Sequence, residues 1–261
     1  MTGSPVVARN GVARVWALYD IHGNLPALEG VLAASDQERP EVPDVIVIGG
    51  DVALGPMPRE TLDSLLALGD RLRWIRGNCD RLVVDAFDGR PLDHLPPQLR
   101  EVVKWTAGQL DASHRDLLAA LPLILVVEVP LLGPVLFCHA TPRSDEEIIT
   151  ARTPVERLRT VLRGVAESLV VCGHTHMQFD RRVDDVRLVN AGSVGMPFGK
   201  PGACWLRLGP EVELMRTDYD LARCAERVRA TSYPQREAFA SHHVLHPRSE
   251  EEMQRVLEPA P

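Results

Sequence analysis

The sequence predicts an α/β fold that begins with a largely parallel sheet. In the first third of the chain, a short apolar run, a polar turn and a helical pattern follow one another three times, which is typical of parallel strands joined by helices. In the second half, pairs of apolar runs are separated by short turns, which indicates antiparallel hairpins beside the parallel strands.

The first elements are expected to alternate between strands and helices. The run Val45-Ile46-Val47-Ile48 is β-branched throughout and is typical of a strand buried on both faces. Predicted strands cover residues 13–18, 45–48 and 73–76, and predicted helices cover residues 25–34 and 60–68. Residues 1–12 are expected to form a short mobile arm.

Residues 82–121 are predicted to be a helical insertion. Pro91, Pro96 and Pro97 interrupt this stretch, and helical patterns follow around residues 99–110 and 113–121. Such an insertion either covers a site or packs on the scaffold.

The second half is expected to complete a single domain of residues 1–261. Predicted strands cover residues 123–129, 135–138, 169–172, 178–183, 186–189, 203–208 and 212–215, with a helix at 154–162. A helical extension occupies about residues 217–261, with two short helices and then a solvated, charged stretch at residues 248–252.

Composition excludes several classes of partner. The chain has 261 residues, 45% of them hydrophobic, and a formal net charge of -7, so nothing favours a nucleic-acid surface. No apolar run approaches the roughly 20 residues needed to cross a bilayer, and no secretory signal is visible. The five cysteines are widely spaced and odd in number, which is typical of reduced thiols. We therefore expect a cytoplasmic protein with no membrane partner. The sequence is compatible with a homo-oligomer.

Polar residues with metal-binding side chains follow the predicted strands. They are Asp20, His22, Asp51, Asn78, His139, His174 and His176. Mixed oxygen and nitrogen donors suit Mn²⁺, Fe, Zn²⁺, Co²⁺ or Ni²⁺ better than Ca²⁺ or Mg²⁺. Seven ligands exceed the needs of one ion, whereas two ions roughly 3.5–4 Å apart that share a carboxylate would use them all.

Each member of this set also has a simpler explanation. Asp20 or Asn78 alone could cap the helix that follows, and His139 could be a packed side chain. The histidines outside the set are expected at the surface or in the tail; they are His94, His114, His242, His243 and His246.

Five motifs in order give the chain a family resemblance. They are Asp20-Ile21-His22, Gly50-Asp51, Gly77-Asn78-Cys79-Asp80, Cys138-His139 and Gly173-His174-Thr175-His176. The set resembles the calcineurin-like metallophosphoesterase family, and most of all its small bacterial and archaeal phosphodiesterase branch. The resemblance implies a two-sheet α/β sandwich with flanking helices.

The resemblance also implies roles for these residues. Asp20, His22 and His176 would bind a first metal ion, and Asn78, His139 and His174 a second. Asp51 would bridge the two ions, with Mn²⁺ favoured. The reaction would be hydrolysis of a small phosphoester, including nucleotides, by a metal-bridging hydroxide.

The sequence departs from the family pattern at two places. Many members carry a histidine proton donor directly after the asparagine, with an aspartate that orients it; here Cys79 and Asp80 stand there. Protein phosphatases and diadenosine tetraphosphatases of the superfamily carry an arginine after the bridging aspartate, and the run Asp51–Pro56 has no cation. The catalytic residues implied are Asp51, Asn78, His139, Cys79 and Asp80.

We therefore expect a dinuclear phosphodiesterase. The alternatives are a phosphomonoesterase, including a protein phosphatase, and a non-catalytic scaffold such as the retromer subunit with this fold. Arg76, Arg81 and Arg143 flank the motif turns and could contact a phosphate, although such arginines more commonly face solvent or form ion pairs.

Overall fold

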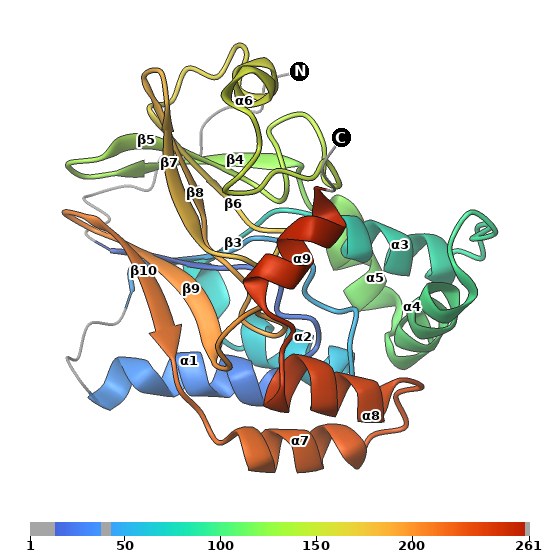
Figure 1. The fold of residues 1–261 in the computed structure, drawn as a ribbon. Helices are drawn as coiled ribbons and strands as arrows, with labels where there is room; N and C mark the ends of the chain where they lie inside the picture. Colours follow the sequence, from blue (N-terminus) through green and yellow to red (C-terminus); the bar gives the residue numbers. More distant parts are fainter. Residues whose placement is uncertain (1–13, 38–42, 259–261) are drawn as a thin grey trace.

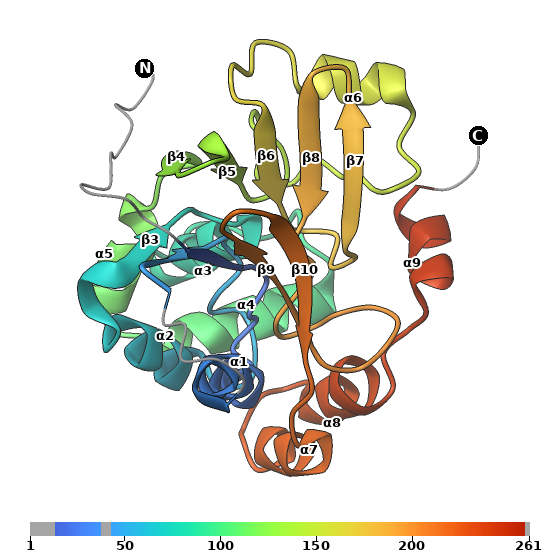
Figure 2. The ribbon, with the colours of Figure 1, turned by 90° about the vertical axis from the view of Figure 1, so that its left-hand side faces the viewer.

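The computed structural model describes residues 14–37 and 43–258 and shows two five-stranded sheets (Figures 1 and 2). The first sheet has the order β10-β9-β1-β2-β3 and the second has the order β4-β5-β6-β8-β7. The predicted arm at residues 1–12 lies outside the described residues.

The first sheet contains β1 (Val15–Leu18), β2 (Val45–Ile48), β3 (Leu72–Trp74), β9 (Ala203–Leu208) and β10 (Val212–Thr217). The second contains β4 (Ile124–Val129), β5 (Gly133–Cys138), β6 (Leu169–Cys172), β7 (Phe179–Val183) and β8 (Val186–Asn190). β1, β2 and β3 are parallel, as are β5, β6 and β8. Every predicted strand is present, and its described ends lie within two residues of the prediction.

Helices cover the outer faces of the sandwich. The described helices are α1 (Leu25–Gln37), α2 (Pro58–Leu66), α3 (Asn78–Phe87), α4 (Pro97–Gln109), α5 (Ala112–Ala120), α6 (Val155–Val161), α7 (Leu221–Arg229), α8 (Arg236–Phe239) and α9 (Glu250–Leu257). In Figures 1 and 2, α1 and α7 lie side by side, and α3, α4 and α5 form a group beside the first sheet. The predicted α/β sandwich with flanking helices is confirmed.

Alternation along β1 explains why the sheets stack. Val15 and Ala17 point into the layer between the sheets, where they join Phe137 and other apolar side chains. Trp16 and Leu18 point to the opposite face and pack with the helices. Burying all four residues of so short a strand favours its place in the middle of the first sheet.

Tyr19 ties the two sheets together at the end of β1. It is fully buried, and its hydroxyl donates to the carbonyl of Val171 at 3.1 Å. Its ring is so close to Gly49 and Gly173 that a Cβ there would lie 2.2 Å and 2.4 Å from ring atoms. These two glycines let the strand-end turns of both sheets approach one another.

The charged stretch at residues 248–252 is exposed, as predicted, and it also begins α9, because Ser249 caps the helix and three glutamates in its first turn suit the helix dipole. One prediction about the insertion was wrong. His114, expected at the surface, is only 3% exposed. Its ring lies between Asp111, which caps α5, and Asp63 of α2, at 3.0 and 2.9 Å.

Candidate metal centre

The predicted ligands meet where the parallel strands of both sheets end. Asp20 and His22 follow β1, Asp51 follows β2, and Asn78 follows β3 as the first residue of α3. His139 follows β5 directly, and the turn of His174 and His176 follows β6. The carboxyl ends of parallel strands lie at one edge of a sheet, so topology alone gathers these side chains.

An unusual backbone conformation accompanies the site. Seven non-glycine residues of the described chain have positive φ, between 48° and 72°. Five of them are predicted ligands, namely Asp20, His22, Asp51, His174 and His176. The left-handed region costs roughly 1–2 kcal/mol for most residues, so its concentration here indicates that geometry is maintained for a purpose.

Backbone carbonyl groups fix the protonation of three imidazoles. Nδ1 lies 3.0 Å from the Leu54 carbonyl in His22, 2.8 Å from the Gly49 carbonyl in His139 and 2.8 Å from the Met196 carbonyl in His176. A carbonyl oxygen only accepts, so each Nδ1 carries the proton and donates it. In the neutral ring, Nε2 then carries a lone pair that can bind a metal ion.

These lone pairs face other acceptors. Nε2 of His22 and Nε2 of His176 are 3.2 Å apart, and Nε2 of His139 is 3.2 Å from Oδ1 of Asn78. Two acceptors at this distance repel one another unless a proton or a metal ion lies between them. The arrangement therefore fits a bound cation.

The two carboxylates are anchored in the same way. One oxygen of Asp20 accepts the N–H of His174 at 2.8 Å, and one oxygen of Asp51 accepts the N–H of Cys79 at 2.8 Å. The other oxygen of Asp20 is buried and has no hydrogen-bond partner among the described residues. A buried carboxylate oxygen without a partner lowers the stability of the fold unless a cation binds it.

Asp51 lies between two groups of ligands. Its Oδ2 is 3.7 Å from Nε2 of His22 and 3.5 Å from Nε2 of His139. Asp20, His22 and His176 form one cluster with the spacing of a metal site, and Asp51, His139 and His174 form another. All seven predicted ligands are thus brought together.

The electrostatic field of the site attracts positive charge. Burial lowers the pKa of His139, but the charges of Asp51 and Asp20 outweigh it and raise that pKa to about 10. Burial and the neighbouring His139 lower the pKa of His174 to about 4. Burial opposes ionisation of Asp51, yet His139 and His22 hold its pKa below the usual range.

Comparison with known proteins identifies the family. The model of the calcineurin-like phosphoesterase superfamily domain matches residues 14–209, three quarters of the chain. The chain belongs to this superfamily. A metallophosphoesterase from Sphaerobacter thermophilus is 27% identical with a TM-score of 0.71, and the match covers 91% of this chain and 100% of that one. A hypothetical protein from Pyrococcus horikoshii OT3 is 23% identical with a TM-score of 0.75, covering 90% and 99%. No curated protein matches the sequence.

The superfamily is metal-dependent. In this chain, Asp80 supports the backbone of the candidate metal centre. Its buried carboxylate accepts the N–H groups of Asp51, Val52 and Gly77 at 2.8, 2.9 and 3.0 Å. Burial and the charge of Asp51 raise its pKa to about 6. Asp80 therefore positions the backbone that carries Asp51 and the start of α3.

Cys79 occupies the place of the histidine found in many superfamily members. The residue is 9% exposed, and its Sγ lies 3.7 Å from Nδ2 of Asn78. Burial and the negative charge of Asp51 raise the pKa of its thiol well above the usual range. Cys79 is thus a protonated thiol and a weak acid, in keeping with the other four cysteines, which are also free and buried.

Two polar residues with a positioning role were not singled out from the sequence. The buried amide of Asn190 donates to Gly173 at 2.6 Å and to Thr175 Oγ1 at 3.1 Å, which supports the His174–His176 turn. The Ser193 hydroxyl donates to the Asp20 carbonyl at 2.8 Å. Asn190 ends β8 and Ser193 lies three residues later, in an Asn-Ala-Gly-Ser stretch that resembles an ordinary loop in the sequence.

The flanking arginines are engaged in ion pairs. Arg81 binds both oxygens of Asp145 at 3.0 Å, and Arg76 lies 3.5 Å from the same carboxylate. Arg143 is paired with Glu147. Of the two common roles expected for these arginines, facing solvent or forming ion pairs, the structure shows ion pairs.

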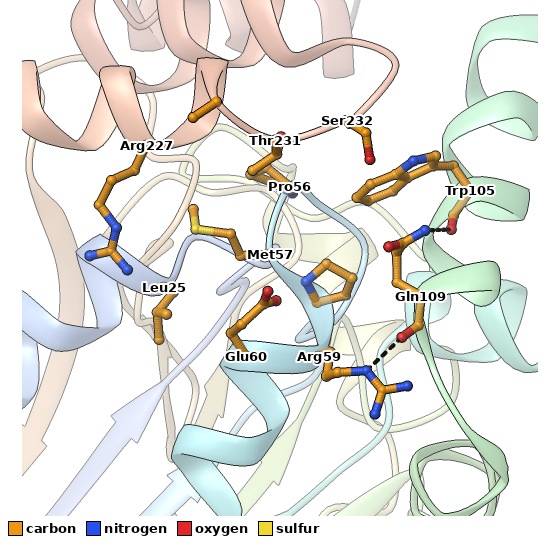
Figure 3. Close-up of a pocket in the computed structure, with 12 residues that line it drawn as sticks. Leu25, Pro56, Met57, Arg59, Glu60, Trp105, Gln109, Arg227, Thr231 and Ser232 are labelled. Carbon is orange, nitrogen blue, oxygen red and sulfur yellow. Dashed lines mark hydrogen bonds between the residues drawn. The ribbon is translucent and has the colours of Figure 1, made fainter.

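A separate cavity of about 480 Å³ lies between α2, α4 and α7 (Figure 3). Its lining includes Met57, Arg59, Trp105 and Arg227, and none of the seven predicted ligands. The centre of the phosphoesterase is therefore not this cavity. None of the helices in the described parts of the chain is long and apolar enough to span a membrane.

Proposed function

We propose that this chain is a dinuclear metal-dependent hydrolase of small phosphodiesters, including nucleotides. The observation that carries the proposal is the position of Asp51, whose Oδ2 lies within 3.7 Å of imidazole nitrogens from both ligand clusters. A carboxylate in that position suits a bridge between two ions.

The ligands divide between two ions. Asp20, His22 and His176 would hold the first ion, and Asn78, His139 and His174 the second, with Asp51 shared. The donor set of imidazoles, carboxylates and one amide suits Mn²⁺, and also Fe, Zn²⁺, Ni²⁺ or Co²⁺. When bound, such a pair supplies a water with a lowered pKa and neutralises charge on the phosphoryl oxygens.

The protein's own groups fix the geometry of this reaction. The Leu54, Gly49 and Met196 carbonyls orient three of the imidazoles by accepting from Nδ1. Asp80 and Asn190 hold the backbone of the ligand turns, so the ligands cannot rotate freely. This preorganisation would keep the metal ligands in position before a substrate binds.

Charge at the site favours a diester over a monoester. A terminal phosphate dianion needs an additional cation, and Arg76, Arg81 and Arg143 are already paired with Asp145 and Glu147. A phosphodiester carries one negative charge less. The absence of a cation in the run after Asp51 likewise gives no support to a protein phosphatase or a diadenosine tetraphosphatase.

The test is hydrolysis of bis-p-nitrophenyl phosphate beside p-nitrophenyl phosphate by the Mn²⁺-loaded protein, with Asp51→Asn as control. We expect a strong preference for the diester that the control loses. A preference for the monoester would favour a phosphatase. No metal-dependent turnover of either ester would favour a non-catalytic scaffold.

A further inference from the structure

The C-terminal helix α9 lies outside the part of the chain that matches the superfamily model. That match ends at residue 209, whereas α9 begins at Glu250. In Figures 1 and 2, α9 rises away from α7 and α8 towards the second sheet. Residues at its two ends form hydrogen bonds with two loops, the Met196 loop (residues 195–199) and the Thr150 loop (residues 148–153).

The chain at the start of α9 is attached to the Met196 loop. The N–H of Gly199 donates to the Arg248 carbonyl at 2.8 Å. The same loop contacts His176, because the Met196 carbonyl accepts from Nδ1 at 2.8 Å and the Phe198 ring stacks on the imidazole, with centroids 5.5 Å apart. The loop that orients this predicted metal ligand is therefore tied to the extension.

The end of α9 is attached to the Thr150 loop through the carboxylate of Glu258. One oxygen accepts from Thr150 Oγ1 at 2.6 Å, and the other accepts from Thr153 Oγ1. Both threonines are fully buried, and the Glu258 side chain is only 15% exposed. Gln254 of α9 also donates to Thr150, and Arg157 lies 3.5 Å from Glu258. Hydrogen bonds to an ionised acceptor are stronger than neutral ones, so this attachment is specific.

The Thr150 loop in turn contacts the turn that carries His174 and His176. The Ile149 carbonyl accepts from the hydroxyl of Thr175, which lies between the two histidines, at 3.3 Å. Thr175 is 2% exposed, and Ile149 is 1% exposed in an apolar cluster that includes the last residue of β6. A shift of the Thr150 loop would therefore move the turn between two predicted ligands.

We propose that α9 is a clasp that raises the metal affinity of the centre, with Glu258 as its main positioning residue. The inference rests on the proposed metal centre. His176 belongs to one ligand cluster and His174 to the other, so a single turn serves both. The clasp joins the two loops that contact this turn. Removing a side chain that orients metal ligands without touching the ion typically lowers metal affinity about 10–100-fold, and Glu258 acts one step further away.

The experiment measures Mn²⁺ affinity by calorimetric titration of the full chain. We expect Glu258→Ala to weaken binding about 3–10-fold, because the buried Thr150 and Thr153 hydroxyls lose their acceptor and release the loop. Glu258→Gln keeps one acceptor oxygen and should recover part of the loss. Hydrogen exchange of the metal-free proteins, followed by mass spectrometry, is the second readout. Amides of residues 172–178 should exchange about 3-fold faster or more in Glu258→Ala.

Glu251→Ala is the matched control, because Glu251 is an exposed glutamate of α9 that pairs with Arg255 of the same helix. It should leave Mn²⁺ affinity and hydrogen exchange unchanged. Wild-type Mn²⁺ affinity in Glu258→Ala would overturn the inference, even if that variant unfolds at lower urea concentration, since Glu258 would then serve only the stability of the fold. Equal weakening in Glu258→Ala and Glu251→Ala would also overturn it. Absence of Mn²⁺ binding by the wild type would refute the proposed metal centre, and the inference with it.

Discussion

Asn190 offers a sharp test of how the ligand turn after β6 is held in place. Its Nδ2 donates to the Gly173 carbonyl and to Thr175 Oγ1, and its Oδ1 accepts the N–H of Gly192 at 2.8 Å. In Asn190→Ala, the buried Gly192 N–H loses its acceptor, which costs about 1–3 kcal/mol, and two further hydrogen bonds are lost at about 0.5–1.5 kcal/mol each. The total is about 2–6 kcal/mol, a large part of the stability of an ordinary domain.

The assay is equilibrium urea unfolding of the metal-free protein, followed by calorimetric titration with Mn²⁺. Because the turn carries His174 and His176, we expect Mn²⁺ affinity to fall about 10–100-fold. Asn190→Asp is the matched variant. It has nearly the same shape but sets a carboxylate oxygen against the Gly173 carbonyl, so it should destabilise the fold at least as much at neutral pH. A loss below about 1 kcal/mol in Asn190→Ala, with unchanged Mn²⁺ affinity, would refute the reasoning.

Two further predictions concern the other ligand turns. Gly50 has φ +89°, and a Cβ there would lie 2.5 Å from the Gly77 nitrogen and 2.8 Å from His139 Nδ1. Gly50→Ala should therefore lower the free energy of unfolding, measured in urea, by more than about 2 kcal/mol. Gly69→Ala is its control, since Gly69 also has positive φ (+64°) but has nothing within 4 Å of the new Cβ; equal losses in the two variants would show that the contact with Gly77 and His139 is unimportant. The second prediction concerns His139, whose pKa is raised to about 10 in the metal-free site. At pH 7.5 both ring nitrogens are therefore protonated, and Nε2 must lose its proton before it can bind a metal ion. Mn²⁺ binding at pH 7.5 should therefore release about one proton or more per chain and strengthen as the pH rises, and calorimetry in buffers of different ionisation enthalpy that detects no proton release would contradict it.

The sequence contained enough information to predict the strands and the gathering of the ligands. A β-branched run such as Val45–Ile48 specifies a buried strand by local pattern alone. Once strands are parallel, the residues that follow them share an edge, so Asp51 and His139 could be expected to meet although 88 positions apart in sequence (139 minus 51). Family resemblance then supplied the expected division into two sets of ligands.

What could not be predicted depends on contacts between distant segments. His114 is buried because α5 packs so that its ring meets Asp63 of α2, a partner that no local pattern around residue 114 reveals. Asp20 and His174 both have positive φ, and a hydrogen bond from the His174 N–H to the Asp20 carboxylate joins their turns, which follow strands of different sheets. Polar residues in such turns look like ordinary loop residues in the sequence.

The central claim is that Asp51 joins two metal sites in one chain, and the most direct measurement is the number of ions bound. Protein loaded with Mn²⁺ and freed of excess metal by gel filtration would be analysed by inductively coupled plasma mass spectrometry, beside Asp51→Asn and His242→Ala. The account predicts two ions per chain in the wild type and in His242→Ala, and at most one in Asp51→Asn. One ion or none in the wild type, or two ions retained in Asp51→Asn, would contradict it.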